Sequence, residues 1–352
     1  MKRSLIRKSV RKMTGYVPGE QPVARDIIKL NTNENPYPPS PRVFKVLAGL
    51  DAARLRLYPN PVSLEMRKTA ARLHGCGLEN VFAGNGSDEI LALCAQAFVE
   101  DNGSIGYFNP SYSLYPVLAD IRDVKKKPVE LGRDFEWRMP PGYGCSLFFL
   151  TNPNAPTSIL YPKSTVRSFC ATFNGVVLID EAYIDFSREH CMDLAMEFDN
   201  VLVMRTLSKS YSLAGLRVGY AVGAKPLIEA LFKIKDSYNL DAISQALAVA
   251  ALSDVKYMRS NVGRIRATRR RMINALTASG HMVYPSETNF LWVKPGGISA
   301  KHFFERLRKE RIFVRYFPGE RTGGYVRITV GTDREVNRLI EAVEKFSGKG
   351  ED

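Results

Sequence analysis

The stretch Gly175-Val-Val-Leu-Ile-Asp180-Glu-Ala-Tyr183 decides the fold class, because it places an unbroken apolar run directly before two acids and a phenol. Such a run is typical of a strand that is buried on both faces, as in a parallel sheet covered by helices. The carboxylate of Asp180 would then emerge at the carboxyl end of the strand, where open α/β sheets bind ligands. The alternative is that Asp180 and Glu181 only cap the next element.

Similar apolar runs recur along the chain with amphipathic segments between several of them, which predicts an α/β fold with a largely parallel sheet flanked by helices. The expected strands of this sheet are residues 105–108, 147–150, 176–179, 201–204 and 218–222. A helical region from Asp241 to about Leu276 then leads into an α+β tail. The strand-like runs of that tail are residues 290–293, 313–315 and 325–330. We therefore expect an N-terminal arm (1–36), a large domain (37–245) and a small C-terminal domain (246–352).

The composition is that of an ordinary globular protein, with 45% hydrophobic and 24% charged residues in 352. No apolar run approaches the roughly 20 residues that span a bilayer, and the basic N-terminus lacks the apolar core of a secretory signal. The five cysteines are scattered without a C-x-x-C pair, which favours a reducing cytoplasm and no metal site.

The net charge of +14 indicates anionic partners. The basic residues are spread along the chain, and no nucleic-acid-binding module is recognisable in it. Small anionic molecules are therefore the expected partners, rather than nucleic acid or a membrane.

A second decisive stretch is Thr206-Leu-Ser-Lys-Ser-Tyr-Ser-Leu-Ala-Gly-Leu-Arg-Val-Gly219, which sets Lys209 among hydroxyls and glycines. A buried lysine beside other cations has a lowered pKa, so its amine can form a Schiff base with an aldehyde. Thr206, Ser208 and Arg217 offer donors for a phosphate. The alternative for a lone lysine is a solvated surface charge. Together with a ring-pairing acid at Asp180 and the phenol of Tyr183, this pattern indicates pyridoxal phosphate.

Three further groups of residues carry weaker signals. The turn from Gly84 through Gly86, Ser87 and Asp88 opens a helix and could cradle an anion, or Ser87 could be an ordinary N-cap. Tyr112 follows a strand, where its ring could stack on a planar cofactor or simply pack. The last group is Arg315 and Arg327, which lie within apolar strand-like runs and so need anionic partners, either carboxylates of the protein or a substrate.

Taken together, these segments resemble the pyridoxal-phosphate enzymes of the aspartate aminotransferase fold, and among them the histidinol-phosphate aminotransferases. The segments that carry the resemblance are Gly15–Glu20, Leu30–Pro36, Leu57–Asn60, Gly86–Glu89, Asn152–Thr157, Ile179–Tyr183, Thr206–Lys209, Ala214–Arg217 and Val326–Thr332. The resemblance implies a mostly parallel seven-stranded sheet in the large domain and a homodimer.

The resemblance also implies roles for individual residues. Lys209 would hold the cofactor as a Schiff base, Asp180 would pair with the pyridine nitrogen, and Tyr183 would bond the ring hydroxyl. The other implied cofactor contacts are Gly86, Ser87, Asp88, Tyr112, Asn154, Thr206, Ser208, Arg217 and, across the dimer, Tyr58. The implied substrate contacts are Tyr16, Asn35, Arg315 and Arg327.

The chain departs from the family pattern at Ala155, where the family commonly has an asparagine that contacts the ring hydroxyl. Asn154 is adjacent and could substitute for it, or Tyr183 could carry more of that role. Loss of one neutral hydrogen bond costs about 1 kcal/mol, which is too little to abolish the chemistry.

The implied reaction is a ping-pong transamination between histidinol phosphate and 2-oxoglutarate in histidine biosynthesis. Two alternatives within the fold are a threonine-phosphate decarboxylase and an aromatic amino-acid aminotransferase. A third alternative, outside enzymes, is a regulatory module that senses pyridoxal phosphate, although the arm is too short and irregular for a DNA-binding segment.

Overall fold

The computed structural model describes residues 5–23 and 26–347, so residues 1–4 and 24–25 of the predicted arm and 348–352 of the predicted small domain lie outside the described residues. The helices are α1 Lys8–Lys12, α2 Pro41–Ala48, α3 Leu64–His74, α4 Gly86–Ala97, α5 Leu114–Arg122, α6 Lys163–Thr172, α7 Leu194–Glu197, α8 Lys225–Ile234, α9 Ala242–Leu252, α10 Val255–Ala278, α11 Ala300–Lys309 and α12 Asp333–Ser347. The strands are β1 Ile28–Lys29, β2 Val81–Gly84, β3 Ser104–Asn109, β4 Lys125–Glu130, β5 Leu147–Thr151, β6 Val176–Asp180, β7 Val201–Thr206, β8 Gly219–Gly223, β9 Met282–Val283, β10 Phe290–Lys294, β11 Ile312–Phe313, β12 Arg315–Tyr316 and β13 Val326–Thr329.

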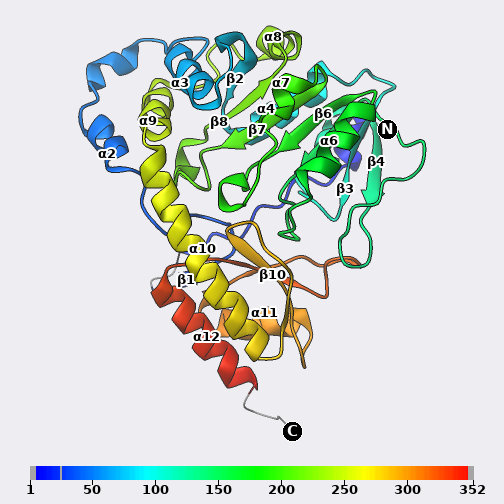
Figure 1. Ribbon diagram of the computed structural model, residues 1–352, viewed down its shortest axis with the longest axis vertical. Coiled ribbons are helices and arrows are strands. Elements are labelled where there is room, and N and C mark those ends of the chain that lie inside the picture. The colour runs from blue at the N-terminus through cyan, green and yellow to red at the C-terminus, as the bar shows by residue number, and fades with distance from the viewer. Residues whose placement is uncertain (1–4, 24–25, 348–352) are drawn as a thin grey trace.

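A seven-stranded sheet in the order β2-β8-β7-β6-β5-β3-β4 forms the upper part of the molecule (Figure 1). Only β8 runs antiparallel to its neighbours, β2 and β7, within this sheet. The other pairs are parallel, so β5, β6 and β7 end at the same edge. The predicted α/β class with a mostly parallel seven-stranded sheet is confirmed.

Helices cover both faces of this sheet because its central strands are apolar on both sides. Leu178 and Phe149 face the cluster formed with α4, α5 and α8. Their neighbours Val177, Ile179 and Phe148 belong to the second cluster, on the opposite face. This strict alternation along each strand explains why β6 has no polar residue before Asp180.

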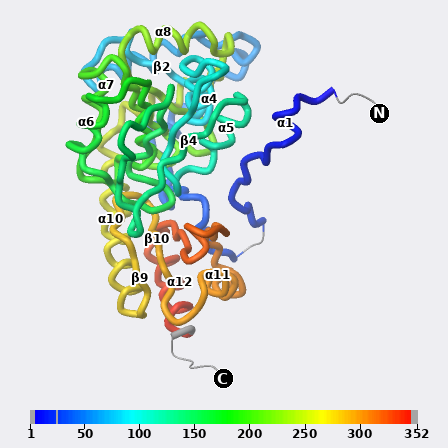
Figure 2. Tube along the Cα trace, turned by 90° about the vertical axis from the view of Figure 1, so that its right-hand side faces the viewer, coloured from blue at the N-terminus to red at the C-terminus, as the bar shows by residue number. Residues whose placement is uncertain are grey.

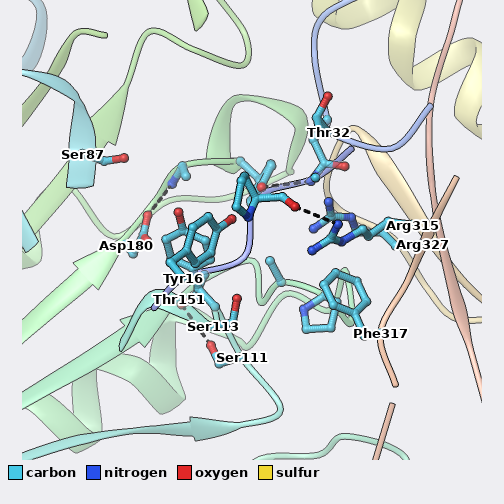
Figure 3. A pocket seen from close by; sticks show the side chains of 18 of the residues that line it. Tyr16, Thr32, Ser87, Ser111, Ser113, Thr151, Asp180, Arg315, Phe317 and Arg327 are labelled. Atoms are coloured by element: carbon cyan, nitrogen blue, oxygen red, sulfur yellow. Dashed lines mark hydrogen bonds between the residues drawn. The ribbon is translucent and has the colours of Figure 1, made fainter. Parts of the chain in front are cut away.

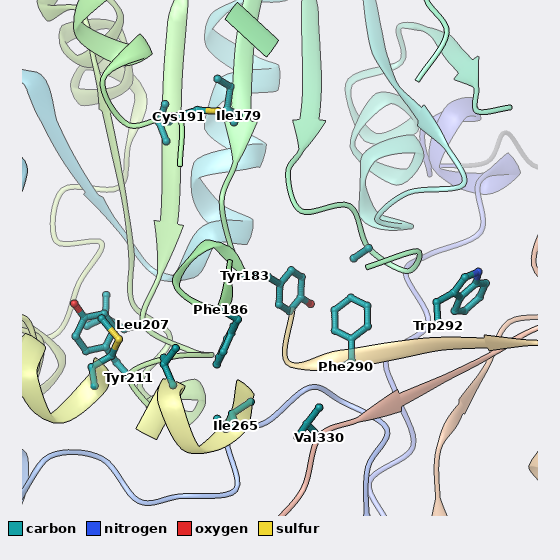
Figure 4. Packing of buried hydrophobic residues seen from close by; sticks show 14 of the residues in the cluster. Ile179, Tyr183, Phe186, Cys191, Leu207, Tyr211, Ile265, Phe290, Trp292 and Val330 are labelled. Carbon is teal, nitrogen blue, oxygen red and sulfur yellow. The ribbon is translucent and has the colours of Figure 1, made fainter. Parts of the chain in front are cut away.

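The second cluster continues into the lower part of the molecule, where β12, β13, β10 and β9 form a four-stranded antiparallel sheet. In Figure 4, Phe186 lies beside Ile265 of α10, and Tyr183 lies beside Phe290 of β10. The rings of Tyr183 and Phe290 meet edge to face, with centroids 5.0 Å apart. The two sheets therefore share one continuous core, alongside which α10 runs (Figure 1).

The N-terminal segment runs along one side of the molecule (Figure 2), where α1 contacts α5. Further along, β1 pairs with β11 in a two-stranded parallel sheet. The carbonyl groups of Val17 and Pro18 accept hydrogen bonds from Arg315, both at 3.1 Å. The arm is thus anchored to the lower part of the molecule.

Most expected elements are present, with differences at their ends and in exposed places. The helical region predicted from Asp241 is two helices, because the chain breaks at Ser253 and Asp254 between α9 and α10. The run predicted as 313–315 is divided between β11 and β12. Strand β4 was not expected, because its Lys125-Lys-Lys127 start is the polar sequence of an exposed edge strand. The predicted domain boundaries at residues 36 and 245 stay predictions.

We expect Arg269→Met to lower the free energy of unfolding by about 2 kcal/mol, since it would leave buried carbonyl groups without their hydrogen-bond donor. Arg269 lies on α10 with a side chain only 7% exposed. It donates to the carbonyl of Thr288 at 2.7 Å and to that of Phe186 at 3.3 Å, and so ties the two parts of the molecule together. Urea denaturation of the protein measures the change.

The matched control is Arg270→Met, because Arg270 is the next residue on the same helix and is exposed. Its expected effect is within about 0.5 kcal/mol. Equal losses in the two variants would contradict a specific role for Arg269.

Candidate active site

A cavity of about 710 Å³ lies at the carboxyl ends of β5, β6 and β7, between the two sheets. Figure 3 shows Asp180, Thr151 and Ser87 on the side of the seven-stranded sheet, and Arg315, Arg327 and Phe317 on the opposite side. The lining also includes Tyr16 of the arm. The ends of the parallel strands, the tail strands and the N-terminal arm thus enclose one cavity. Open α/β sheets bind ligands at this edge.

Asp180 ends β6 and is 4% exposed. Its Oδ1 accepts the backbone N–H of Ala182 at 3.0 Å, and its Oδ2 accepts the hydroxyl of Tyr115 at 2.8 Å. Burial raises the pKa of the Asp180 carboxyl to about 6, and the two hydrogen bonds act against that rise. A cationic group in the cavity would favour the ionised form, so this carboxylate is suited to pair with a protonated nitrogen.

Lys209 lines the same cavity from the loop after β7. Its Nζ donates to the carbonyl of Thr32 at 3.2 Å and lies 6.0 Å from the centre of the Tyr183 ring. Burial, together with the charges of Arg327 and Arg217, lowers the pKa of Lys209 to about 8 against the opposing effect of Glu34. A substantial fraction of this amine is therefore neutral near pH 8 and able to attack a carbonyl carbon.

The phenol of Tyr183 also faces the cavity. Its oxygen accepts a hydrogen bond from the amide of Asn33 at 3.0 Å, which fixes the direction of the O–H group. Burial raises the pKa of Tyr183, so the phenol stays protonated and can donate to a ligand. Ala155 lines the cavity as well, with a methyl group that offers no hydrogen bond.

A set of donors for an anion gathers at the start of α4. Ser87 lies in the first turn of α4 and lines the cavity, and the backbone N–H groups of such a turn have no partner within the helix. Arg217 donates to Ser208 and contacts Asp88, both at 3.3 Å. The hydroxyl of Thr206 lies 3.0 Å from that of Ser208. Three elements thus supply hydroxyls, amides and one guanidinium at one end of the cavity.

Gly86 and Gly219 make this close approach possible. Gly86 has φ +79°, and a β-carbon there would lie 2.8 Å from Arg217. A β-carbon on Gly219 of β8 would lie 2.8 Å from the backbone nitrogen of Ser87. The first turn of α4 can therefore lie directly against the sheet.

The far end of the cavity holds the two arginines of the tail strands. The Nη2 of Arg327 donates to the carbonyl of Asn31 at 2.9 Å, while its buried Nε has no hydrogen-bond partner among the described residues. Its guanidinium lies 5.3 Å from the ring centres of both Phe290 and Phe317. A buried cation with an unused donor is a natural site for an anionic ligand.

Two of the aromatic residues predicted to lie at the site contact each other. The ring of Tyr16 meets that of Tyr112 edge to face, with centroids 5.8 Å apart. Tyr112 also donates to Asp88 at 3.3 Å. The arm and the segment after β3 therefore close the cavity together.

Four predicted residues do not line this cavity. Gly86 lies behind Arg217, and Tyr58 is 81% exposed on another face. Asn154 is fully buried, and its amide donates to the carbonyl of Pro110 and to the hydroxyl of Thr157. Asn35 donates to the carbonyl groups of Lys209 and Ser210, at 3.0 and 3.1 Å, and so braces the lysine's backbone from outside.

The sequence reasoning did not single out Asn33, Tyr115 or Thr32, although each contacts one of the central groups. All three lie in segments that were noted for other residues. Tyr115 follows Tyr112 by only three positions, and their rings meet edge to face. That spacing was the available signal.

Comparison with known proteins agrees with this geometry. Residues 25–343 match the family described as aminotransferase class I and II. The chain is 41% identical over 346 residues to a histidinol-phosphate aminotransferase of Rippkaea orientalis, covering 97% of this chain and 99% of that one. It is 42% identical over 346 residues to a histidinol-phosphate aminotransferase of Synechocystis, covering 97% and 98%.

Among solved structures, the fold is similar to histidinol-phosphate aminotransferase from Sinorhizobium meliloti in complex with pyridoxal-5'-phosphate, with a TM-score of 0.87, 23% identity and 98% of each chain covered. The chain belongs to the class I and II aminotransferases. The family predicted from the sequence motifs is therefore confirmed.

The described residues hold neither a metal-binding cluster nor a membrane-spanning helix. No group of three or more histidine, cysteine, aspartate and glutamate side chains in this part of the chain is arranged to hold a metal ion. Likewise, none of the described helices has the length and apolar character needed to cross a membrane.

Replacement of Arg327 by leucine should raise the pKa of Lys209, because it removes the strongest neighbouring charge that lowers this pKa. Mild labelling of the cofactor-free protein with formaldehyde and borohydride, followed by peptide mass analysis, measures how methylation of Lys209 depends on pH. We expect a labelling midpoint near pH 8 in the unaltered protein and a higher midpoint in Arg327→Leu.

Arg321→Leu is the control, since Arg321 is bonded to the carbonyl groups of Leu131 and Gly132 and is not among the charges acting on Lys209. A midpoint that does not move in Arg327→Leu would contradict the coupling.

Proposed function

We propose that the chain is a pyridoxal-phosphate-dependent aminotransferase that exchanges an amino group between histidinol phosphate and 2-oxoglutarate, as in histidine biosynthesis. The observation that carries the proposal is the enclosure of Lys209, Asp180 and Arg327 in one cavity. It is supported by the names of the relatives that are about 40% identical over nearly the whole chain.

The residues of the cavity fit the cofactor. When bound, pyridoxal phosphate supplies an electron sink that stabilises negative charge at the substrate carbon. Asp180 would meet the ring nitrogen as a carboxylate, and Tyr183 would donate to the ring hydroxyl. The phosphate would take the donors at the start of α4 together with Ser208 and Arg217.

Lys209 has two tasks in this proposal. Its neutral amine would hold the aldehyde carbon of the cofactor covalently until substrate arrives. Once released, the same Nζ is placed to take a proton from the substrate carbon and to return it to the cofactor carbon as general base and acid. The lowered pKa of Lys209, about 8, suits both steps near neutral pH.

The anionic end of each substrate would meet Arg327, with Arg315 and Tyr16 beside it. Histidinol phosphate carries a phosphate and glutamate carries a side-chain carboxylate, so one cationic pocket can serve both half-reactions. The two phenylalanine rings that contact Arg327 exclude water and so strengthen its attraction for an anion.

A panel of amino donors with 2-oxoglutarate tests the substrate assignment. We expect kcat/KM for histidinol phosphate to exceed that for histidinol by about 100-fold or more, because the phosphate makes charge-assisted hydrogen bonds that histidinol lacks. Coupled measurement of glutamate formation gives both values.

The same panel separates the alternatives. Release of carbon dioxide from threonine phosphate would favour the decarboxylase, and equal use of aromatic amino acids would favour an aromatic aminotransferase. Either result would contradict the assignment to histidinol phosphate.

We also propose that two copies of the chain associate and that each lends Tyr58 to the other's phosphate site. Tyr58 is 81% exposed, stacks on Tyr238 at 4.4 Å and lies outside the cavity of its own chain. Leu55 and Leu57 beside it are 61% and 50% exposed, so this face presents apolar side chains that a partner copy would cover.

A mixing experiment tests the exchange of Tyr58. At limiting cofactor, we expect Tyr58→Ala to be weak, because one phosphate contact is lost, and Lys209→Ala to be inactive. Co-expressed subunits of the two variants form hybrid dimers in which one site has both residues. At low cofactor concentration, the hybrid should regain part of the wild-type activity. This part is at most about half, because only one of the two sites in the hybrid is intact.

The control is a dimer in which both subunits carry Tyr58→Ala, with affinity tags and purification as for the hybrid. If the hybrid is no more active than this control, Tyr58 does not act across the dimer.

The cytoplasm remains the compartment that we propose. All five cysteines are free, and Cys94, Cys170 and Cys191 are buried. Unpaired buried thiols are typical of proteins in reducing compartments.

A further inference from the structure

We propose that Tyr115 is a positioning residue that holds the carboxylate of Asp180 toward the cofactor's ring nitrogen. This inference rests on the proposed function, since it needs a pyridine ring in the cavity. Tyr115 itself is not part of the cavity lining, and its hydroxyl reaches the site through its hydrogen bond to Asp180.

The ring of Tyr115 is fixed from several sides. It belongs to the first turn of α5 and is 0% exposed. It stacks on Phe149 of β5 with centroids 4.8 Å apart and meets Tyr112 edge to face at 5.5 Å. A hydroxyl carried by so constrained a ring can hold its acceptor in one orientation.

The directions of the hydrogen bonds follow from the geometry. The phenol donates to Oδ2 of Asp180 at 2.8 Å, and the Ala182 amide donates to Oδ1 at 3.0 Å. The Tyr115 oxygen also lies 2.5 Å from the hydroxyl oxygen of Thr151. Since the phenol proton is directed to Asp180, the Thr151 hydroxyl donates to the phenol oxygen. A chain of donors thus runs from Thr151 through Tyr115 to Asp180.

This chain leaves Asp180 free to accept from the cavity. Each carboxylate oxygen has one donor from the protein, and an ionised carboxylate can accept about four hydrogen bonds. The charged neighbours that affect Asp180, namely Asp88 of α4 and the adjacent Glu181, both raise its pKa, as does burial. The Tyr115 hydroxyl is the largest influence that lowers it. Without that hydroxyl, the carboxylate would be both less fixed and easier to protonate.

Tyr115→Phe keeps the ring and removes only the hydroxyl, so it tests the inference directly. We expect the dissociation constant for pyridoxal phosphate, measured by absorbance titration of the cofactor-free protein, to rise about tenfold. We expect kcat to fall while the KM for glutamate changes by less than about twofold. The loss of kcat should be greater at pH 6 than at pH 8.5, because a higher pKa leaves more Asp180 protonated at the lower pH.

The matched control is Tyr161→Phe. Tyr161 is also a buried tyrosine, and its hydroxyl donates to the backbone carbonyl of Phe135 at 3.1 Å, outside the cavity. Tyr161→Phe therefore loses a comparable buried hydrogen bond away from the cavity. Its effect on cofactor binding and kcat shows what the loss of such a bond does to the structure alone. An unchanged dissociation constant and pH profile in Tyr115→Phe, or equal changes in both variants, would overturn the inference.

Thr151→Val provides a second measurement if Tyr115→Phe does not fold. It keeps the phenol and removes the donor behind it, so a smaller change in the same direction is expected, about threefold in the dissociation constant. No change would count against the chain of donors. Cofactor titration needs no substrate, so a protein that binds pyridoxal phosphate but does not use histidinol phosphate would disprove the substrate assignment and leave this test intact.

Discussion

The parallel pairing of β6 with β5 and β7 is the constraint on which the site depends. In that register Thr151 lies opposite Asp180, and Asp180 lies opposite Met204, two residues before Thr206. Three chain segments therefore end side by side and deliver an acid, a hydroxyl and the loop that carries Lys209. Because the strands are buried on both faces, a slip of one residue would turn each apolar side chain to the wrong cluster. The core thus determines which polar groups meet at the edge.

The two ends of the cavity use charge differently. At the start of α4, Arg217 contacts Asp88, so its charge is already partly balanced. At the other end, Arg327 has only the carbonyl of Asn31 and aromatic rings as described contacts. This imbalance lowers the pKa of Lys209 and attracts an anion at the same time. An anion that paired with Arg327 would therefore also raise the pKa of Lys209.

The features that could be predicted from the sequence are those written in local patterns. The apolar run of β6 indicated a buried strand, because a strand buried on both faces has consecutive apolar residues. The motif around Lys209 likewise indicated a reactive lysine from neighbouring residues. Contacts between distant segments produce no local sequence pattern. The hydrogen bond from Tyr115 to Asp180, for example, joins residues 65 positions apart. The same limit explains Asn154, whose side chain turns to Pro110 and Thr157 rather than to the cavity.

The outer strand β4 has a consequence for how molecules of this protein meet. Its first residues are the exposed Lys125, Lys126 and Lys127, and Pro128 follows them. An edge strand presents unpaired backbone groups that invite pairing with a strand of another molecule. Here an approaching strand would meet three ammonium groups and a residue without an N–H. This edge of the sheet is thereby protected against edge-to-edge aggregation, while the long apolar strands lie at its centre.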